Sequence, residues 1–201
     1  MAFNTEVANL ALSHLGIGKL ISDIETEQSA EAKACRTFYD IVFKTVLRDY
    51  PWPFATRFKA LALVEENPND EWDFSYKYPT DCLFARRIVG VNRNPAADEK
   101  IPFRVVSSEE GTLIYTDVDQ AVLEYTINID DNTLMTADFV MAFSYKLASV
   151  IAPIITSGDP MKVGAAAKQS YFEELSNAKA NAFNEEQPDI APESEFTRTR
   201  L

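Results

Sequence analysis

The spacing of apolar residues changes twice along the chain. Over residues 4–50 they recur every three or four positions, as on the buried stripe of an amphipathic helix. From Arg57 onward they alternate with polar neighbours, which is the pattern of a half-buried strand. Helical spacing returns near Thr136. The pattern predicts helices at both ends of the chain and strands between them.

Two helices are predicted in the first part of the chain. Asn4 or Thr5 caps the first, which ends at Gly16 because glycine readily terminates a helix. The second begins at Thr26 or Ser29 and ends before Pro51, since proline disfavours helical backbone in the residue that precedes it. Trp52 lies between two prolines, so the chain must turn there and the indole must pack nearby.

Two more helices are predicted over residues 133–185. Thr133 or Thr136 begins the third helix, and Pro153 kinks or ends it. Asp159, which is followed by a proline at the first helical position, begins the fourth. Together with the first pair, these helices are expected to form a bundle.

Six short strands joined by tight turns are predicted over residues 56–130, as an antiparallel meander. The expected fold class is therefore α+β: a four-helix bundle of two N-terminal and two C-terminal helices, with an inserted antiparallel β region. Residues 1–187 form a single domain in this scheme. Residues 188–201 form an extended C-terminal arm, because two prolines forbid a helix and too few apolar residues are present to fold alone.

Composition narrows the class of function. The chain has 201 residues and a formal net charge of −12, which argues against binding nucleic acid through its phosphates. Cys35 and Cys82 lack the spacing of a metal or redox centre, so both are expected to be buried free thiols in a reducing compartment. No apolar run reaches the roughly 18 residues that a membrane helix needs. We therefore expect a soluble protein with no cofactor, no metal and no membrane partner.

The sequence carries no common catalytic motif. His14 is the only histidine, and no serine, cysteine or carboxylate lies at a spacing typical of a triad. Glycine-rich phosphate loops, the zinc-protease helix motif and the serine nucleophile elbow do not occur. The chain is therefore not expected to be an enzyme.

Acidic residues gather in one stretch of the chain. Between Arg104 and Lys146 there is no basic residue, and the acids there include Asp117, Asp119 and Glu124. Such a run is usually a solvated face. It could also hold a divalent cation or supply the paired acids of a hydrolase. A third interpretation is a channel wall that repels the phosphates of passing DNA.

Arg86 and Arg87 follow one another in a predicted strand, so their side chains should point to opposite faces of the sheet. At most one of them should then be buried and paired. We expect one of them to serve a carboxylate of the acidic stretch or of a neighbouring subunit.

Two segments resemble a known family. Residues 50–55 read YPWPFA, and residues 76–87 read YKYPTDCLFARR. Together with the order of elements, they resemble the head-to-tail adaptor of short-tailed phages, also called the tail tubular protein A family, in which hPWxFA and YxxPxDCLxxRR patterns recur. The N-terminal stretch ALSHLG and the closing stretch YFEELSNAKANA are also similar to that family. The likeness runs over residues 8–174.

This resemblance implies a structural virion protein. Members of the family form a ring of about twelve copies below the portal, closed by symmetry. The ring extends the DNA channel for ejection, seats the tail nozzle and sometimes the fibres, and has no catalytic role as a rule. By this likeness the chain is located in the virion tail after assembly in the host cytoplasm. Its partners are the portal, the nozzle and itself, and genomic DNA passes without specific binding.

Two sets of site residues follow from this interpretation. The arm offers Phe196 as an aromatic anchor with Arg198, Arg200 and Leu201 beside it, a composition suited to binding the portal or a neighbouring copy. The acids Asp117, Asp119 and Glu124 face the channel. Two alternatives remain open: a metal-dependent or acid-pair hydrolase, and a small acidic cytoplasmic binding module.

Overall fold

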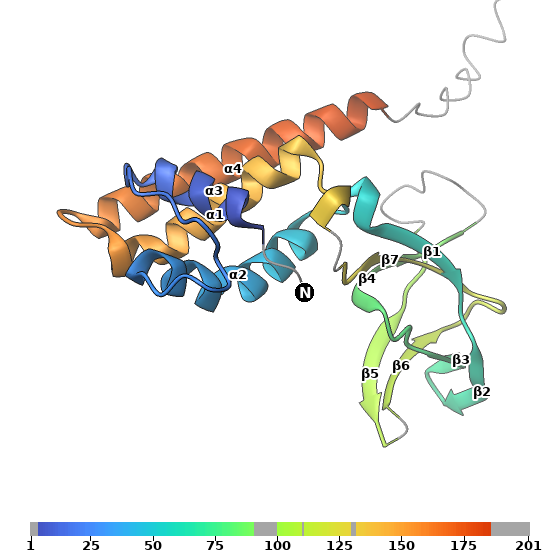
Figure 1. The fold of residues 1–201 in the computed structure, drawn as a ribbon. Coiled ribbons are helices and arrows are strands. Elements are labelled where there is room, and N and C mark those ends of the chain that lie inside the picture. Colours follow the sequence, from blue (N-terminus) through green and yellow to red (C-terminus); the bar gives the residue numbers. More distant parts are fainter. Residues whose placement is uncertain (1–3, 91–99, 110, 130–131, 186–201) are drawn as a thin grey trace, which may run out of the picture.

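The computed structural model describes residues 4–90, 100–109, 111–129 and 132–185 (Figure 1). Four helices lie together at one end of the molecule, and the strands lie at the other (Figure 1). The helices are α1 (Thr5–His14), α2 (Ala30–Asp49), α3 (Ala137–Ile155) and α4 (Pro160–Glu185). α3 packs against each of the other three helices, so it is the central helix of this helical region.

The helices begin where the sequence predicts. The Asn4 side chain accepts hydrogen bonds from the first backbone N–H groups of α1, and Ser29 does the same for α2. Thr136 caps α3, and the Asp159 carboxylate accepts a bond of 3.1 Å from the backbone N–H of Lys162 in α4. These polar side chains satisfy donors that a helix leaves open, which is why the predicted starts are confirmed.

An aromatic cluster forms the centre of the helical core. Phe43 on α2 meets Phe139 and Phe143 on α3 edge to face, with ring centroids 5.5 and 5.4 Å apart. Tyr39 packs edge-on against Phe143 at 4.9 Å, and Trp52 against Phe139 at 5.0 Å. All five side chains are buried. Burial of this much aromatic surface binds the N-terminal helices to the C-terminal ones.

Trp52 also fixes the corner that ends the first pair of helices. Its side chain is 2% exposed, and Nε1 donates a hydrogen bond of 2.9 Å to the backbone carbonyl of Val46. A single 3-10 turn, η1 (Pro53–Ala55), follows and leads into the first strand. The predicted corner with a packed indole is confirmed.

In the part of the chain that the structure describes, seven strands form the other end of the molecule. They are β1 (Thr56–Ala60), β2 (Leu63–Asn69), β3 (Trp72–Lys77), β4 (Cys82–Ile88), β5 (Arg104–Ser108), β6 (Gly111–Thr116) and β7 (Val122–Ile127). One sheet has the order β1-β7-β4 and the other β2-β3-β6-β5, with every pairing antiparallel. A second short turn, η3 (Asn132–Leu134), precedes α3.

The prediction of a four-helix bundle with an inserted β region is wrong. The β content is substantial. In the sequence, two antiparallel sheets lie between the N-terminal helices and the two C-terminal helices. These sheets have their own core, in which Tyr76, Ile114, Leu123 and Tyr125 are buried. The predicted meander of six strands is also wrong, since β7 lies between β1 and β4.

The error arises at Leu61 and Ala62, where one alternating run of sequence becomes two strands in two sheets. The backbone N–H of Leu61 donates to the carbonyl of Ala121, just before β7, at 2.9 Å. The carbonyl of Ala62 accepts from the N–H of Lys77 on β3, also at 2.9 Å. Adjacent residues thus bond to different sheets. The alternation of apolar and polar residues in the sequence continues where the chain passes from one sheet to the other, so it does not reveal the change.

Arg86 on β4 connects the β region to the end of α2. Its guanidinium donates bonds of 2.9 Å to the carbonyls of Leu47 and Tyr50, and its Nε donates to Thr126 Oγ1 at 2.8 Å. The last carbonyls of a helix lack hydrogen-bond donors within the helix. Arg86 supplies donors for two carbonyls at the end of α2.

α3 has the length and composition of a membrane-spanning helix, unlike the other helices of the described residues. The prediction from apolar runs overlooked it, because Asp138 and Lys146 interrupt the run without making it polar. Its buried side chains pack on the other helices, and a central helix of a folded core has the same composition.

Candidate functional site

The three predicted channel acids do not form one cluster. Asp117 and Asp119 are exposed and follow β6, and Asp117 Oδ1 accepts a bond of 3.1 Å from the backbone N–H of Asp73. Glu124 lies in β7, in the other sheet, and pairs with Arg87. Among the described residues, no group of three or more histidines, cysteines and acids could hold a metal ion.

Arg86 and Arg87 are both half-buried, and of the two only Arg87 forms an ion pair with a carboxylate of the described residues, in keeping with the prediction that at most one of them is buried and paired. A bulge in the β4–β7 ladder between Ala85 and Arg87 shifts the register, so simple alternation fails there. Arg86 turns to the end of α2, and Arg87 pairs with Glu124, whose side chain is 14% exposed. The expectation that one arginine serves an acid of the stretch is confirmed.

His14 lies beside a serine, but the arrangement is not that of a nucleophile and base. Its Nε2 is 3.0 Å from Ser144 Oγ, and the ring stacks on Tyr145 with centroids 3.7 Å apart. The single hydroxyl proton of Ser144 is donated to the carbonyl of Met141 at 2.8 Å, so the imidazole N–H donates to Oγ. Ser144 is fully buried. Burial lowers the pKa of His14.

The two cysteines have the opposite character to reactive thiols. Cys35 is buried, and its burial raises the thiol pKa to about 12. Cys82 is half-buried and its pKa is also raised, chiefly by desolvation. Reactive cysteines have a lowered pKa, so neither thiol is prepared for nucleophilic attack. The predicted burial is confirmed for Cys35 and is only partial for Cys82.

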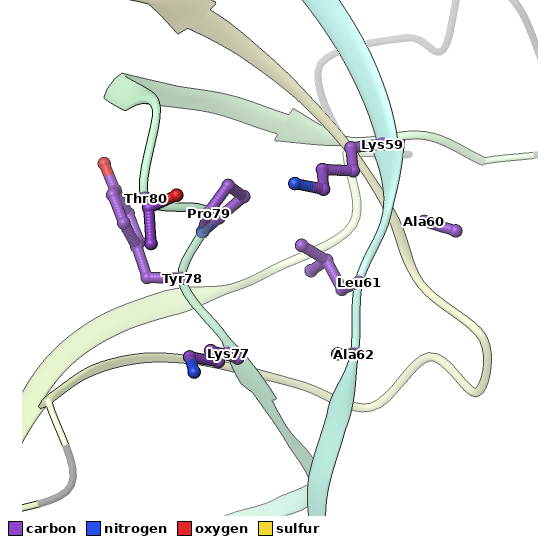
Figure 2. A pocket seen from close by; sticks show the side chains of 8 residues that line it. All are labelled: Lys59, Ala60, Leu61, Ala62, Lys77, Tyr78, Pro79 and Thr80. Carbon is purple, nitrogen blue, oxygen red and sulfur yellow. The ribbon is translucent and has the colours of Figure 1, made fainter.

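A pocket opens where the chain passes between the two sheets. Figure 2 shows it between the segment that joins β1 to β2 and the turn that follows β3, with the Lys59 side chain directed toward Pro79. It is lined by Lys59, Ala60, Leu61, Ala62, Lys77, Tyr78, Pro79 and Thr80. Its volume is about 140 Å³. Small-molecule sites are usually about 300–1,000 Å³, so this pocket suits a single side chain better than a substrate.

A larger groove runs between the end of α3 and the start of α4, with a volume of about 390 Å³. It is lined by Lys146, Ser149, Val150, Pro153, Pro160, Met161, Gly164, Ala165 and Lys168. Met161 is 74% exposed, and Ile154 and Phe172 on the same two helices are also exposed. The groove thus has an apolar centre with lysines beside it. Sequence analysis missed it, because each helix taken alone shows only scattered apolar residues on its polar side.

The outer strands expose apolar side chains, although the alternation from Arg57 onward predicted a half-buried strand. Phe58 on β1 is 62% exposed, and Leu63 and Val64 on β2 are also exposed. β1 and β2 are edge strands of their respective sheets, so they have a hydrogen-bonded neighbour on one side only. The charged residues interleaved in both strands are the sequence signal of an edge that reaches solvent.

The predicted arm, residues 188–201 with Phe196, Arg198, Arg200 and Leu201, lies outside the described residues. No protein-family model matches the chain, and no curated protein matches it.

Proposed function

We propose that this chain is a structural subunit that assembles with copies of itself into a ring adaptor of a short-tailed phage. In this role the ring connects the portal to the tail nozzle, can seat fibres, and extends the channel through which DNA leaves the head. The subunit is assembled in the host cytoplasm and resides in the virion tail. The support comes from the two sequence segments of the adaptor family and from the surfaces described above.

The observation that carries the proposal is the exposed apolar edge formed by β1 and β2. Phe58, Leu63 and Val64 lie on two consecutive edge strands with open backbone groups. A ring subunit needs lateral surfaces that differ from one another and repeat head to tail. An apolar edge with unpaired backbone groups is one such surface, since strand edges readily pair with another chain.

Within this proposal the protein has no catalytic role. The histidine, the cysteines and Glu124 have the environments of structural groups, and no geometric observation favours the hydrolase. Asp117 and Asp119 remain suitable for a channel wall, because exposed carboxylates repel DNA phosphates. Glu124 is less suited, since Arg87 compensates its charge.

Mass photometry of the purified chain, alone and with the cognate portal protein, tests the proposal. We expect a species many times heavier than the 22.6 kDa subunit when the portal is present. The double variant Phe58→Ser, Val64→Ser should reduce its yield at least about tenfold, because it removes the apolar edge. The matched control Leu20→Ser, Ile41→Ser, which replaces exposed apolar residues of the helical region, should assemble normally.

Two outcomes overturn the proposal. A wild-type chain that stays monomeric with the portal supports the small binding module instead. Cell-wall hydrolysis or metal binding by the purified protein would support the hydrolase.

A further inference from the structure

The groove between α3 and α4 carries a charge opposite to that of the protein. The chain has a net charge of −12, yet over residues 139–172 the only charged residues are Lys146, Lys162, Lys168 and Asp159. No described carboxylate lies within ion-pair distance of any of these lysines. Lys146 Nζ instead lies 4.5 Å from the centre of the Tyr171 ring. The lysines beside the groove are therefore available to an acidic partner.

The floor of the groove is a close contact between α3 and α4. A side chain at Gly164 would meet Ala152 Cβ and the carbonyl of Ser149, each at 3.3 Å, so α3 and α4 touch there without space to close further. Val150, Pro153 and Met161 line the same groove. An apolar side chain flanked by carboxylates would fit both the centre and the rim of such a site.

The chain itself contains a segment of that composition. Residues 185–195 read EEQPDIAPESE, with five acids, no base, and Ile190 between Asp189 and Glu193. Its two prolines disfavour a helical conformation. Its charge is complementary to the groove lysines, and Ile190 is complementary to the apolar centre.

Ile190 of this segment is too far along the chain from the groove to reach it within the same copy. α4 ends at Glu185, and at a rise of about 1.5 Å per residue its end lies roughly 26 Å beyond Lys168. Ile190 follows five residues later, and an extended chain of that length spans at most about 18 Å. Ile190 therefore falls short of its own groove. A groove on a neighbouring copy is not subject to this limit.

We propose that the α3–α4 groove of one copy receives the acidic segment 189–195 of the next copy. Ile190 occupies the apolar centre near Met161, and the flanking carboxylates pair with Lys146 and Lys168. The contact is head to tail, so it repeats around a closed ring. It rests on the self-assembly proposed above, but it uses a surface distinct from the β1–β2 edge.

Cross-linking between two differently tagged full-length chains tests the contact. A Met161→Cys chain is mixed with an Ile190→Cys chain and treated with a short bismaleimide. We expect a covalent pair that carries both tags. The matched control replaces Met161→Cys by Leu20→Cys, an exposed site in the connection between α1 and α2, and should give no pair above the wild-type background. The wild-type chain measures the background from Cys35 and Cys82.

Charge reversal tests the electrostatic part. Lys168→Glu, at the exposed one of the two lysines that the proposal pairs with the segment, should lower the cross-link yield severalfold at low salt. Lys179→Glu makes the same change of charge at an exposed site elsewhere on α4, and should leave the yield unchanged. Added salt should weaken the wild-type cross-link, because exposed charges are screened.

The outcomes separate this inference from the proposed function. Ring formation on the portal without the cross-link overturns the inference and leaves the function standing. A cross-link in a chain that never binds the portal supports the inference and overturns the proposed function. A cross-link formed only within the doubly substituted Met161→Cys, Ile190→Cys chain places the segment on its own groove and also overturns the inference.

Discussion

The helical region and the β region bury their side chains to different degrees. α3 packs against three other helices, and its buried face includes Phe139, Phe143 and Leu147. β1 and β2 leave nearly every residue exposed, including Phe58. Apolar burial is the main favourable term in folding, so the helices hold most of the stability. The strands instead expose apolar side chains that other subunits can contact. This difference is expected in a subunit whose helical region stabilises the fold and whose β region takes part in assembly.

The largest expected effect is at the corner between the regions. Trp52→Ala removes a buried indole that packs on Phe139 and bonds the carbonyl of Val46. It should lower the free energy of unfolding by about 3–5 kcal/mol, measured by urea denaturation. Trp72→Ala is the comparison, because this indole is half-buried in β3 and its buried Nε1 has no partner. An equal loss at Trp72 would contradict the assignment of stability to the helices.

Arg86→Ala tests the link between the two regions. The variant removes three hydrogen bonds, two of them to carbonyls at the end of α2, at an expected cost of about 1.5–3 kcal/mol. The β region should then unfold before the helices. Fluorescence of Trp52→Phe and Trp72→Phe backgrounds follows each region separately. Arg87→Ala, which breaks the pair with Glu124 between β4 and β7 and leaves the bonds to the end of α2 in place, should keep the two transitions together.

Tyr171→Phe probes one contact within the helical region. The phenol donates a hydrogen bond of 2.6 Å to Asp49, so α4 is tied to the end of α2. Because Asp49 is exposed and can bind water instead, the loss should be only about 0.5–1.5 kcal/mol. A double-mutant cycle with Asp49→Ala, which removes the acceptor, measures the coupling. Additive effects would show that the bond contributes nothing.

The smallest effect is a pH dependence at His14. Burial lowers its folded-state pKa below that of an ordinary histidine, so the unfolded chain binds the proton more readily. The stability contribution is present above the unfolded pKa and is lost as pH falls toward the folded pKa. The melting temperature of wild type should therefore fall more between pH 7.5 and 5.5 than that of His14→Gln. Equal shifts in both proteins would show that His14 does not titrate differently on folding.

The helices were predictable because their determinants are local. Asn4, Ser29, Thr136 and Asp159 cap helices through residues three or fewer positions away, and Pro51 stops α2 by its own ring. Such signals need no knowledge of the rest of the fold. The burial of Trp52 followed in the same way from the two prolines around it.

The sheets were predictable only as strands. Alternation identifies a strand, but the choice of partner depends on residues far along the chain, as when Thr56 pairs with Thr126. The register shift at Arg86 and Arg87 and the exposure of Phe58 follow from those partners, so no window of sequence contains them. The groove between α3 and α4 was hidden for the same reason, since it exists only where two helices meet.

The central place of β7 also limits when the chain can fold. Among the described strands, β1 and β4 pair within their sheet only with β7, which is made after both of them. α1 and α2 likewise pack on α3, which is made later still. Contacts between distant segments require long loops to close first, which slows folding. A nascent chain that stops before β7 therefore carries open strand edges and the aromatic face of α2 without their partners, and during synthesis this interval is the one most exposed to aggregation.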